Sequence, residues 1–248
     1  MSLNLEIVNE IAAELGIDPA FVEKDWYSVQ VLSAISAHQS DTICTVFSGG
    51  TSLSKGYGLL KRFSEDLDFR CRYLVEGSGH KKKKIRSEYR QGILSTIGSL
   101  GLVDLDERQV EVASKYIKFP LSYSSQSAVH PSLRPDLEVE FSFTQPRLPP
   151  KLKSVQSLVS QFTASEPETN ILCLSAIQTG ADKLSALTWR LLRRERSDPS
   201  DDPAIIRHLH DLCALAPVIE AHRDSFIKTA QASFEDDQKT GRRVTGVA

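Results

Sequence analysis

Two aspartates that stand two positions apart, Asp66 and Asp68, are the residues whose types and spacing best suit chemistry. They end the segment Arg62-Phe-Ser-Glu-Asp-Leu-Asp-Phe69, whose alternation predicts the start of a β-strand. Side chains at i and i+2 of a strand point to the same side, so both carboxylates reach one place while Leu67 and Phe69 face the core. Adjacent carboxylates repel each other unless a cation lies between them, and their oxygens suit Mg²⁺ or Mn²⁺. The pair predicts a divalent metal site, although a solvated strand edge explains a lone D-x-D pattern equally well.

A glycine turn lies about fourteen residues before the aspartates. The β-branched, apolar segment 42–47 predicts a buried strand, and Ser48-Gly-Gly-Thr-Ser52 leads from it into a predicted short helix. Glycines at such a point let the backbone approach a phosphate, whose charge meets free N–H groups. We therefore predict phosphate ligands at Gly49, Gly50, Thr51 and Ser52, while noting that such a turn more often only connects two elements.

Further charged residues can complete the site from later segments. Glu138 and Glu140 share one face of the alternating segment 136–143, and we choose Glu140 as third metal ligand because an apolar strand end follows it. The wet face of an antiparallel sheet explains both glutamates nearly as well. Lys183 and Arg190 are two helical turns apart on one stripe, so they can face a triphosphate or form a solvated helix face.

The elements that must position these residues divide the chain into an α+β part and a helical part. Asp18 and Pro19 predict a helix start, as N-cap and first helical residue, after a first helix at 3–15. Strands are predicted at 42–47, 67–73, 110–113, 116–123 and 136–143, and a polar loop at 77–84 leads into a helix that ends near residue 100. After the proline-rich break 145–150 we predict helices at 154–162, 170–177, 181–196, 203–214 and 216–234, with a polar loop at 197–203 and a fraying tail from residue 235. The predicted domains are residues 1–150 and 151–248.

Composition limits the classes of function. The chain has 248 residues and a net charge of −2, so nucleic acid can be held only by a local basic patch such as Lys81–Lys84 with Arg86 and Arg90. That run can equally be a solvated loop. No apolar run approaches the roughly 18–20 residues that span a bilayer, and the N-terminus lacks a signal-peptide layout, so we predict a cytoplasmic protein. The four cysteines form no C-x-x-C pair, which argues against a zinc site or a disulfide framework.

Five segments carry a resemblance to a known family. In chain order they are Glu23-Lys-Asp-Trp26, Phe47-Ser-Gly-Gly-Thr-Ser-Leu-Ser-Lys55, Arg62-Phe-Ser-Glu-Asp-Leu-Asp-Phe69, Ala181-Asp-Lys-Leu184 and Arg207-His-Leu-His-Asp-Leu212. Together they resemble the AbiEii/AbiGii family of nucleotidyltransferase-like toxins, the toxin half of type IV abortive-infection and toxin–antitoxin systems. The resemblance runs over about residues 20–215, and the G-G-T-S-L and R-x-S-x-D-h-D blocks are its specific parts.

The resemblance implies a fold and a set of roles. The fold is that of DNA polymerase β-type nucleotidyltransferases, a mixed sheet flanked by helices with a C-terminal helical bundle. It implies transfer of NMP from an NTP to an acceptor hydroxyl, in some members on tRNA, with Mg²⁺ or Mn²⁺ and a cognate antitoxin encoded nearby. By this resemblance Ser64 is an active-site serine, Asp66 and Asp68 bind metal, Lys183 contacts phosphates, and Asp211 is an essential aspartate of the helical lobe.

Two other functions stay open at this point. His210-Asp211 is an H-D dipeptide of the kind that metal phosphohydrolases use, although such sites need further His and Asp ligands on neighbouring helices. A chain that keeps the fold but lacks catalysis would bind nucleotide or RNA without turnover. The chain also departs from the family pattern, because His208 stands where the first aspartate of an R-D-h-x-D motif is common. Intact Asp66, Asp68 and Lys183 favour the enzyme.

Overall fold

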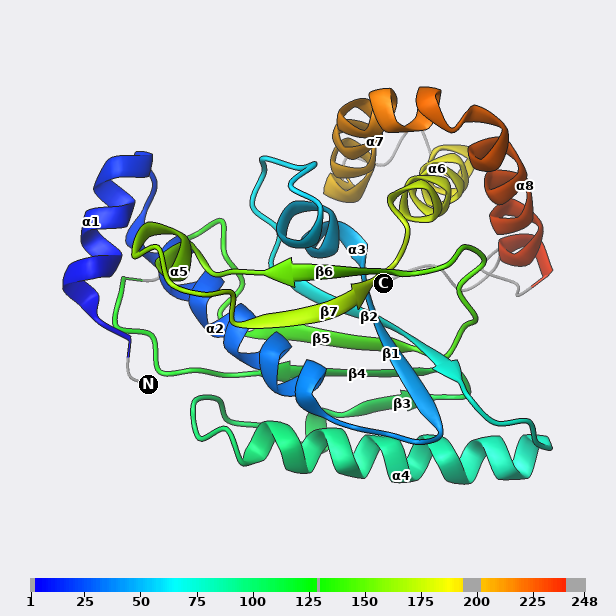
Figure 1. The fold of residues 1–248 in the computed structure, drawn as a ribbon, viewed down its shortest axis with the longest axis horizontal. Helices are drawn as coiled ribbons and strands as arrows, with labels where there is room; N and C mark the ends of the chain where they lie inside the picture. The colour runs from blue at the N-terminus through cyan, green and yellow to red at the C-terminus, as the bar shows by residue number, and fades with distance from the viewer. Residues whose placement is uncertain (1–2, 129, 194–201, 240–248) are drawn as a thin grey trace.

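A computed structural model describes residues 3–128, 130–193 and 202–239. Its centre is a seven-stranded mixed sheet with the strand order β3-β4-β5-β2-β1-β7-β6 (Figure 1). The β2–β5 and β1–β7 pairs are parallel, and the other pairs are antiparallel. The strands are β1 (Ile43–Ser48), β2 (Asp66–Tyr73), β3 (Glu111–Ala113), β4 (Tyr116–Leu121), β5 (Leu137–Ser142), β6 (Lys151–Val155) and β7 (Thr169–Cys173).

Two long helices, α2 (Pro19–Ala37) and α4 (Gly79–Gly98), cover one face of this sheet (Figure 1). The apolar residues of β2 and β5 point into this layer, where the rings of Phe69 and Phe141 stack with centroids 4.9 Å apart. Because strand side chains alternate, the carboxylates of β2 and β5 point to the opposite face. The predicted alternation of both strands, with the acidic residues on one side, is confirmed.

Shorter helices complete the α+β part. The helix α1 (Leu5–Leu15) packs on α2, which begins as predicted with Asp18 accepting the N–H of Ala20 at 2.9 Å. The glycine turn leads into one turn of α-helix, α3 (Gly49–Thr51), and a short π-helical segment, η1 (Ser52–Gly56). A short 3₁₀ helix, η2 (Glu107–Gln109), precedes β3, and α5 (Leu158–Phe162) lies between β6 and β7.

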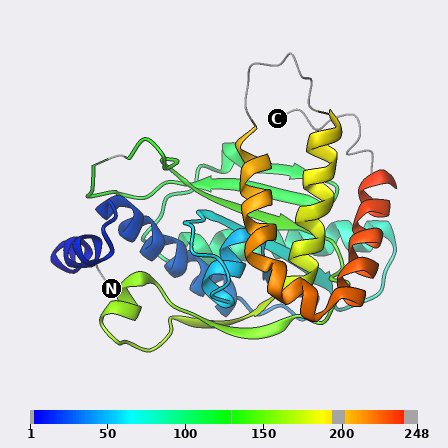
Figure 2. The ribbon, with the colours of Figure 1, turned by 90° about the horizontal axis from the view of Figure 1, so that it is seen from above.

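Three C-terminal helices lie side by side (Figure 2). They are α6 (Ala176–Arg193), α7 (Pro203–Ala221) and α8 (Arg223–Lys239). Residues of α6 and α7 line a cavity together with Asp66, Asp68 and Glu140, so these helices lie over the acidic face of the sheet. Leu215 of α7 packs against Leu53 and Leu60, which follow the glycine turn, and Arg70 of β2 forms an ion pair of 2.5 Å with Asp182 of α6. These contacts hold the helices against the sheet. Within the described residues, no helix is both long and apolar enough to cross a membrane.

The structure corrects two predicted helices. Residues 151–155 and 169–173 are the strands β6 and β7, where the sequence predicts helix at 154–155 and 170–173. Ile171 and Cys173 alternate into the core from a five-residue segment, and a run this short does not distinguish strand from helix by its pattern. The domain boundary at residue 150 stays a prediction. A division that keeps the sheet whole falls after Cys173, and we propose that position instead.

Three boundaries also differ from the predictions. The segment 79–84 is not a loop, because α4 begins at Gly79 with Ser78 as its N-cap. The helix predicted to end at residue 214 continues through Ala221 despite Pro217, and the next helix begins only at Arg223. The helix predicted at 181–196 begins five residues earlier, at Ala176, because β7 ends at Cys173. The sequence predicts a tail from residue 235, but α8 continues through Lys239. The rest of the predicted tail and most of the predicted loop at 197–203 lie outside the described residues.

Candidate active site

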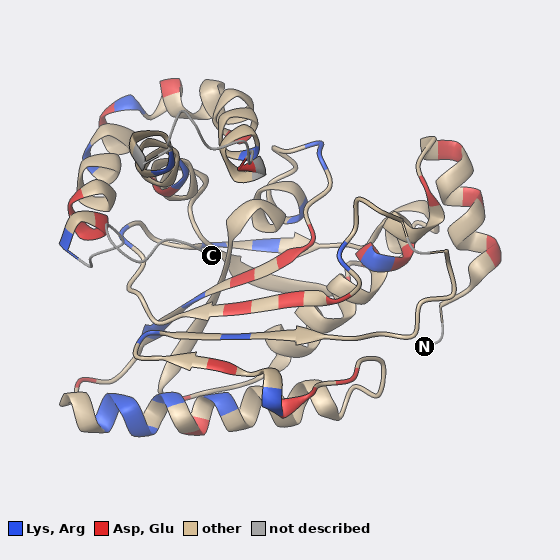
Figure 3. Ribbon diagram, turned by 180° about the vertical axis from the view of Figure 1, so that it is seen from behind, with Lys and Arg blue, Asp and Glu red and all other residues tan. Residues whose placement is uncertain are grey.

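The four carboxylates of β2 and β5 form two adjacent pairs on the face below the C-terminal helices. The strand register sets Asp66 beside Glu138 and Asp68 beside Glu140. The acidic positions of the two strands appear as neighbouring red segments of the ribbon in Figure 3. The pKa of Asp68 is raised to about 7, chiefly by burial and next by the charges of Glu140 and Asp66, while Lys183 and Arg134 act in the opposite direction. A carboxyl group with this pKa is in strong electrostatic contact with other anions and attracts a cation.

The glycine turn is built around one of these carboxylates. Ser48 pairs with Asp68 across β1 and β2, and the next residue, Gly49, has a φ of 74°. A Cβ atom on Gly49 would lie 1.9 Å from Asp68 Oδ2, and one on Gly50 would lie 2.9 Å from Ser64 Oγ. Only glycine permits both the left-handed backbone and the close approach of the carboxylate. The turn and the D-x-D segment, which the sequence shows as separate motifs, are therefore one structural unit.

The hydroxyls of Thr51 and Ser52 are bonded inside this unit. Hydrogen bonds join Thr51 Oγ1 to the carbonyl oxygen of Asp66 at 2.6 Å and to Ser64 Oγ at 3.0 Å. Ser52 Oγ donates to the carbonyl oxygen of Gly49 at 3.0 Å, and its side chain is fully buried. The hydroxyls of Thr51 and Ser52 thus stabilise the turn by hydrogen bonds within the protein, and their role as phosphate ligands stays a prediction.

A second cluster joins the sheet to the helices. The carboxylate of Asp211 in α7 accepts two hydrogen bonds from Arg62, from Nε at 2.7 Å and from Nη2 at 2.6 Å, and Lys183 Nζ lies 2.8 Å from its Oδ2. Asp211 is completely buried. Although its burial opposes ionisation, the Arg62 and Lys183 bonds lower its pKa to about 2, so it is an anion at neutral pH. It holds both cations in place at the edge of the cleft.

These groups meet in a cavity of about 340 Å³ between the sheet and the helices. The predicted site residues that line it are Gly49, Gly50, Ser64, Asp66, Asp68, Glu140, Lys183 and Arg190. Thr51, Ser52 and Asp211 do not line it but contact residues that do. An adjoining hollow of about 480 Å³ shares Asp66, Asp68 and Glu140 with the cavity and extends over β4 and β5. The structure therefore brings together residues from both parts of the chain.

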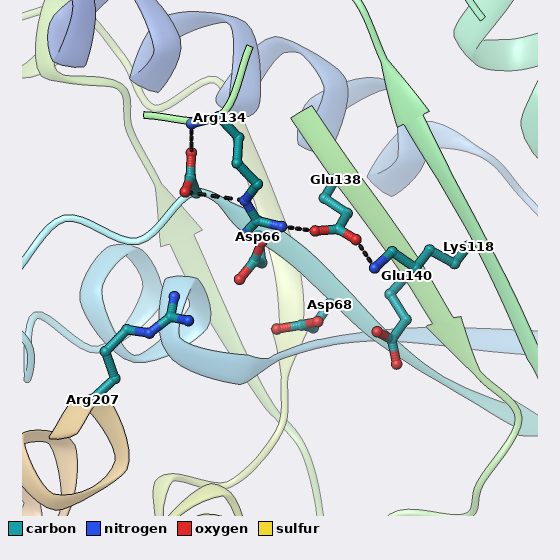
Figure 4. A pocket seen from close by; sticks show the side chains of 8 residues that line it. Asp66, Asp68, Lys118, Arg134, Glu138, Glu140 and Arg207 are labelled. Carbon is teal, nitrogen blue, oxygen red and sulfur yellow. Dashed lines mark hydrogen bonds and ion pairs between the residues drawn. The ribbon is translucent and has the colours of Figure 1, made fainter. Parts of the chain in front are cut away.

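Several cations of the cleft have no place in the sequence prediction. Arg134, which lies just before β5, contacts Glu65, Asp66 and Glu138, and Lys118 of β4 also pairs with Glu138 (Figure 4). Two cations thus neutralise Glu138. Glu140 is the strand neighbour of Asp68 and lines the same cavity, which makes it the candidate for a third carboxylate. Only Lys118 has a local signal, because it alternates with buried residues of β4.

His208, which stands where an R-D-h-x-D motif has its first aspartate, changes the charge of the cleft. The pKa of His208 is lowered to about 4, chiefly by burial and next by the charges of Lys183 and Arg190, so the imidazole is neutral at pH 7. Its Nδ1 is buried and has no hydrogen-bond partner among the described residues. A neutral ring therefore stands where the family pattern carries an aspartate. Arg190, at the rim, pairs with Asp202.

The donor chemistry at β2 fits a hard divalent cation. Mg²⁺ commonly uses one or two carboxylates and takes its other ligands from water and substrate phosphates. Asp66 and Asp68 supply such a pair, and burial together with the charges of Glu140 and Asp66 raises the pKa of Asp68. The described residues contain no group of three or more His, Cys, Asp or Glu side chains that could hold a metal by themselves. The pair fits a metal that substrate helps to bind.

Comparison with known proteins decides the family. A family model described as "Nucleotidyl transferase AbiEii toxin, Type IV TA system" matches residues 30–246, most of the chain. The chain belongs to this family. A search of curated proteins gave no match for this AbiEii-family chain.

One solved structure with a similar fold is "MenT4, nucleotidyltransferase toxin Rv2826c from Mycobacterium tuberculosis H37Rv". Its TM-score is 0.50, with 19% sequence identity, over 84% of this chain and 69% of that chain. Identity this low supports the fold alone. The predicted family, the nucleotidyltransferase class and the mixed-sheet fold are confirmed.

Proposed function

We propose that this AbiEii-family nucleotidyltransferase transfers NMP from an NTP to an acceptor hydroxyl, with Asp66 and Asp68 as ligands of Mg²⁺ or Mn²⁺. The observation that carries the proposal is the position of Asp66, Asp68 and Glu140 in one cavity that Arg62, Lys183 and Arg190 also line. Such an arrangement suits a triphosphate and its metal, because the carboxylates attract the metal and the cations attract the phosphates. Glu140 is the proposed third carboxylate.

The residues of the cavity have distinct roles in this proposal. Lys183 and Arg62, both fixed by Asp211, bind the phosphates and stabilise the charge that develops on the departing pyrophosphate. Gly49 and Gly50 let the triphosphate approach the backbone, and Arg190 contacts it from the rim. A divalent metal held by Asp66 and Asp68 would lower the pKa of the acceptor hydroxyl and offset the charge of the phosphates.

The proposed reaction is an in-line displacement. The acceptor oxygen attacks the α-phosphorus, the bond from that phosphorus to the bridging oxygen breaks, and pyrophosphate leaves with the bonding electrons. The hydroxyl proton is released to solvent. Ser64 faces the same cavity with its hydroxyl next to Thr51, where it orients the phosphate being transferred.

We further propose RNA, tRNA in particular, as the acceptor. We also propose a cognate antitoxin as a protein partner, because the family belongs to type IV toxin–antitoxin systems. The test incubates purified protein with each α-labelled NTP, Mg²⁺ or Mn²⁺, and total tRNA. Labelled RNA that requires metal is the expected product, and a labelled protein would instead identify a protein acceptor. If Asp66→Ala labels the acceptor as well as wild type does, the site assignment is wrong.

Two alternative functions, a metal phosphohydrolase and an inactive nucleotide- or RNA-binding protein, predict different experimental results. A phosphohydrolase centred on His210-Asp211 would need Asp211 as a metal ligand, yet its carboxylate is buried and held by Arg62 and Lys183. Metal-dependent hydrolysis of dNTPs without acceptor labelling would nevertheless favour it. An inactive binding protein would show NTP- and metal-dependent thermal stabilisation with no turnover.

A further inference from the structure

A fully buried lysine connects the helical layer behind the sheet with the catalytic face. Lys24 of α2 has no exposed surface, and its three N–H groups have three acceptors. They are Glu65 Oε2 at 2.6 Å, the carbonyl oxygen of Arg134 at 2.5 Å and that of Asp136 at 3.1 Å. Glu65 directly precedes Asp66 in the chain. The lysine thus ties the start of β2 to the segment that enters β5.

Arg134 extends this connection to the catalytic carboxylate. Its backbone N–H and its Nε both donate to Glu65, each at 3.2 Å, and its two terminal nitrogens contact Asp66 and Glu138 (Figure 4). Burial opposes ionisation of Glu65, but Lys24 and Arg134 lower the pKa of Glu65 below its ordinary value. Glu65 is therefore an anion that fixes the guanidinium in position.

The loop before Arg134 is also anchored to α2. The buried carboxylate of Glu23 accepts the backbone N–H of Gln126 at 2.7 Å, that of Ser127 at 2.9 Å, and the hydroxyl of Ser125 at 3.0 Å. Neighbouring residues of one helix therefore hold both ends of the loop. Because buried charges need such partners, these contacts fix the positions of Ser125–Ser127 and of Arg134 relative to α2. In the segment Glu23-Lys-Asp-Trp26, Glu23 and Lys24 therefore attach residues 125–127 and 134–136 to α2.

We propose that Arg134 is a positioning residue that holds the Asp66 carboxylate and competes with the divalent metal for it, and that Lys24 acts through Arg134. The inference rests on the proposed function, since it assumes that Asp66 binds metal. A guanidinium and a metal ion cannot both use the same carboxylate lone pairs fully, so metal binding requires that Arg134 release part of its contact. Lys24 and Glu65 set how readily it does so.

The test measures Mn²⁺ binding to the metal-free full chain, without nucleotide, from the electron paramagnetic resonance signal of free Mn²⁺. Arg134→Gln should lower the Kd by about three- to tenfold, the range expected for loss of a half-exposed charged hydrogen bond. Lys24→Met should also lower the Kd, and it should add nothing in the Arg134→Gln background, because the two residues act in one chain of contacts. An additive effect of Lys24→Met, or an unchanged or higher Kd in Arg134→Gln, overturns the inference.

A matched control separates direct contact from the general field of a positive charge. Lys118→Gln removes a cation from the same cleft that pairs with Glu138 and does not touch Asp66. Its effect on the Kd should be smaller than that of Arg134→Gln, and an equal effect overturns the inference. If Lys24→Met does not fold, Glu65→Gln replaces it in the double-mutant comparison. Asp66→Asn must weaken Mn²⁺ binding in every case; if it does not, the proposed metal site fails rather than the role of Arg134.

Discussion

Replacement of Gly49 by alanine adds one methyl carbon where the glycine turn meets the carboxylate of Asp68. That carbon would lie 1.9 Å from Asp68 Oδ2, whereas real Cβ atoms essentially never come within 3.0 Å of such a neighbour, so one of the two groups must move by about 1 Å. A displacement of about 1 Å at a reacting group can cost about 100-fold in rate. The left-handed backbone, with a φ of 74°, adds about 1–2 kcal/mol of strain.

The assay compares transfer activity and unfolding free energy for Gly49→Ala and a matched control. Gly58 has a similar φ of 64°, and no atom lies within 4 Å of the place of its Cβ. Gly58→Ala should therefore pay the same backbone strain of about 1–2 kcal/mol and keep its activity. Gly49→Ala should lose at least about 100-fold in kcat/KM while it remains folded. Equal activities of the two variants would refute the reasoning that the turn positions Asp68.

Three further changes test the electrostatics of the cleft. Asp211→Asn leaves the Arg62 and Lys183 charges without their buried anion and should destabilise the fold by about 3–5 kcal/mol in urea unfolding; a loss below 1 kcal/mol would contradict this. The pKa of Asp211 is lowered to about 2, so its contribution to stability is complete above about pH 4 and is lost as the pH falls towards 2. The unfolding free energy of wild type should therefore fall more between pH 4 and pH 2 than that of Asp211→Asn. The raised pKa of Asp68, about 7, has the opposite sign, because metal-free stability falls as the pH rises from about 4 to 7. Asp68→Asn in EDTA should therefore melt above wild type at pH 8, and this difference should be smaller at pH 5. Lys183→Met should lower kcat/KM for NTP by about 100-fold or more, because a buried charge-assisted contact to phosphate is lost; an unchanged value would place Lys183 outside the phosphate site.

The centre of the site could be predicted from sequence because its signals are local. Alternation in β2 and β5 sets Asp66, Asp68 and Glu140 on one face, and glycine after a β-branched run indicates a tight turn before a helix. These patterns depend on backbone geometry alone. What they do not show is why the turn must be glycine, since that depends on the contact between Gly49 and Asp68 across two strands.

The rest depends on contacts between distant residues. Arg134 and Lys24 are ordinary charged residues in sequence, and their roles arise because β5 pairs in parallel with β2 and brings the entry to β5 beside Glu65. The sequence prediction missed β6 and β7, which lie at one end of the sheet, for a related reason. Each has only five residues, and β7 is defined by pairing with β1 and β6 rather than by a pattern of its own.

The most direct test of the central claim is the single-turnover rate of NMP transfer by Asp66→Asn at saturating Mn²⁺ and NTP. The substitution keeps the size of the side chain and removes only the charge that the proposed metal requires. We predict a loss of at least about 1,000-fold with the fold intact, comparable to removal of a main electrostatic contributor to catalysis. Transfer within about twofold of the wild-type rate would contradict the assignment of the carboxylate pair as the catalytic centre.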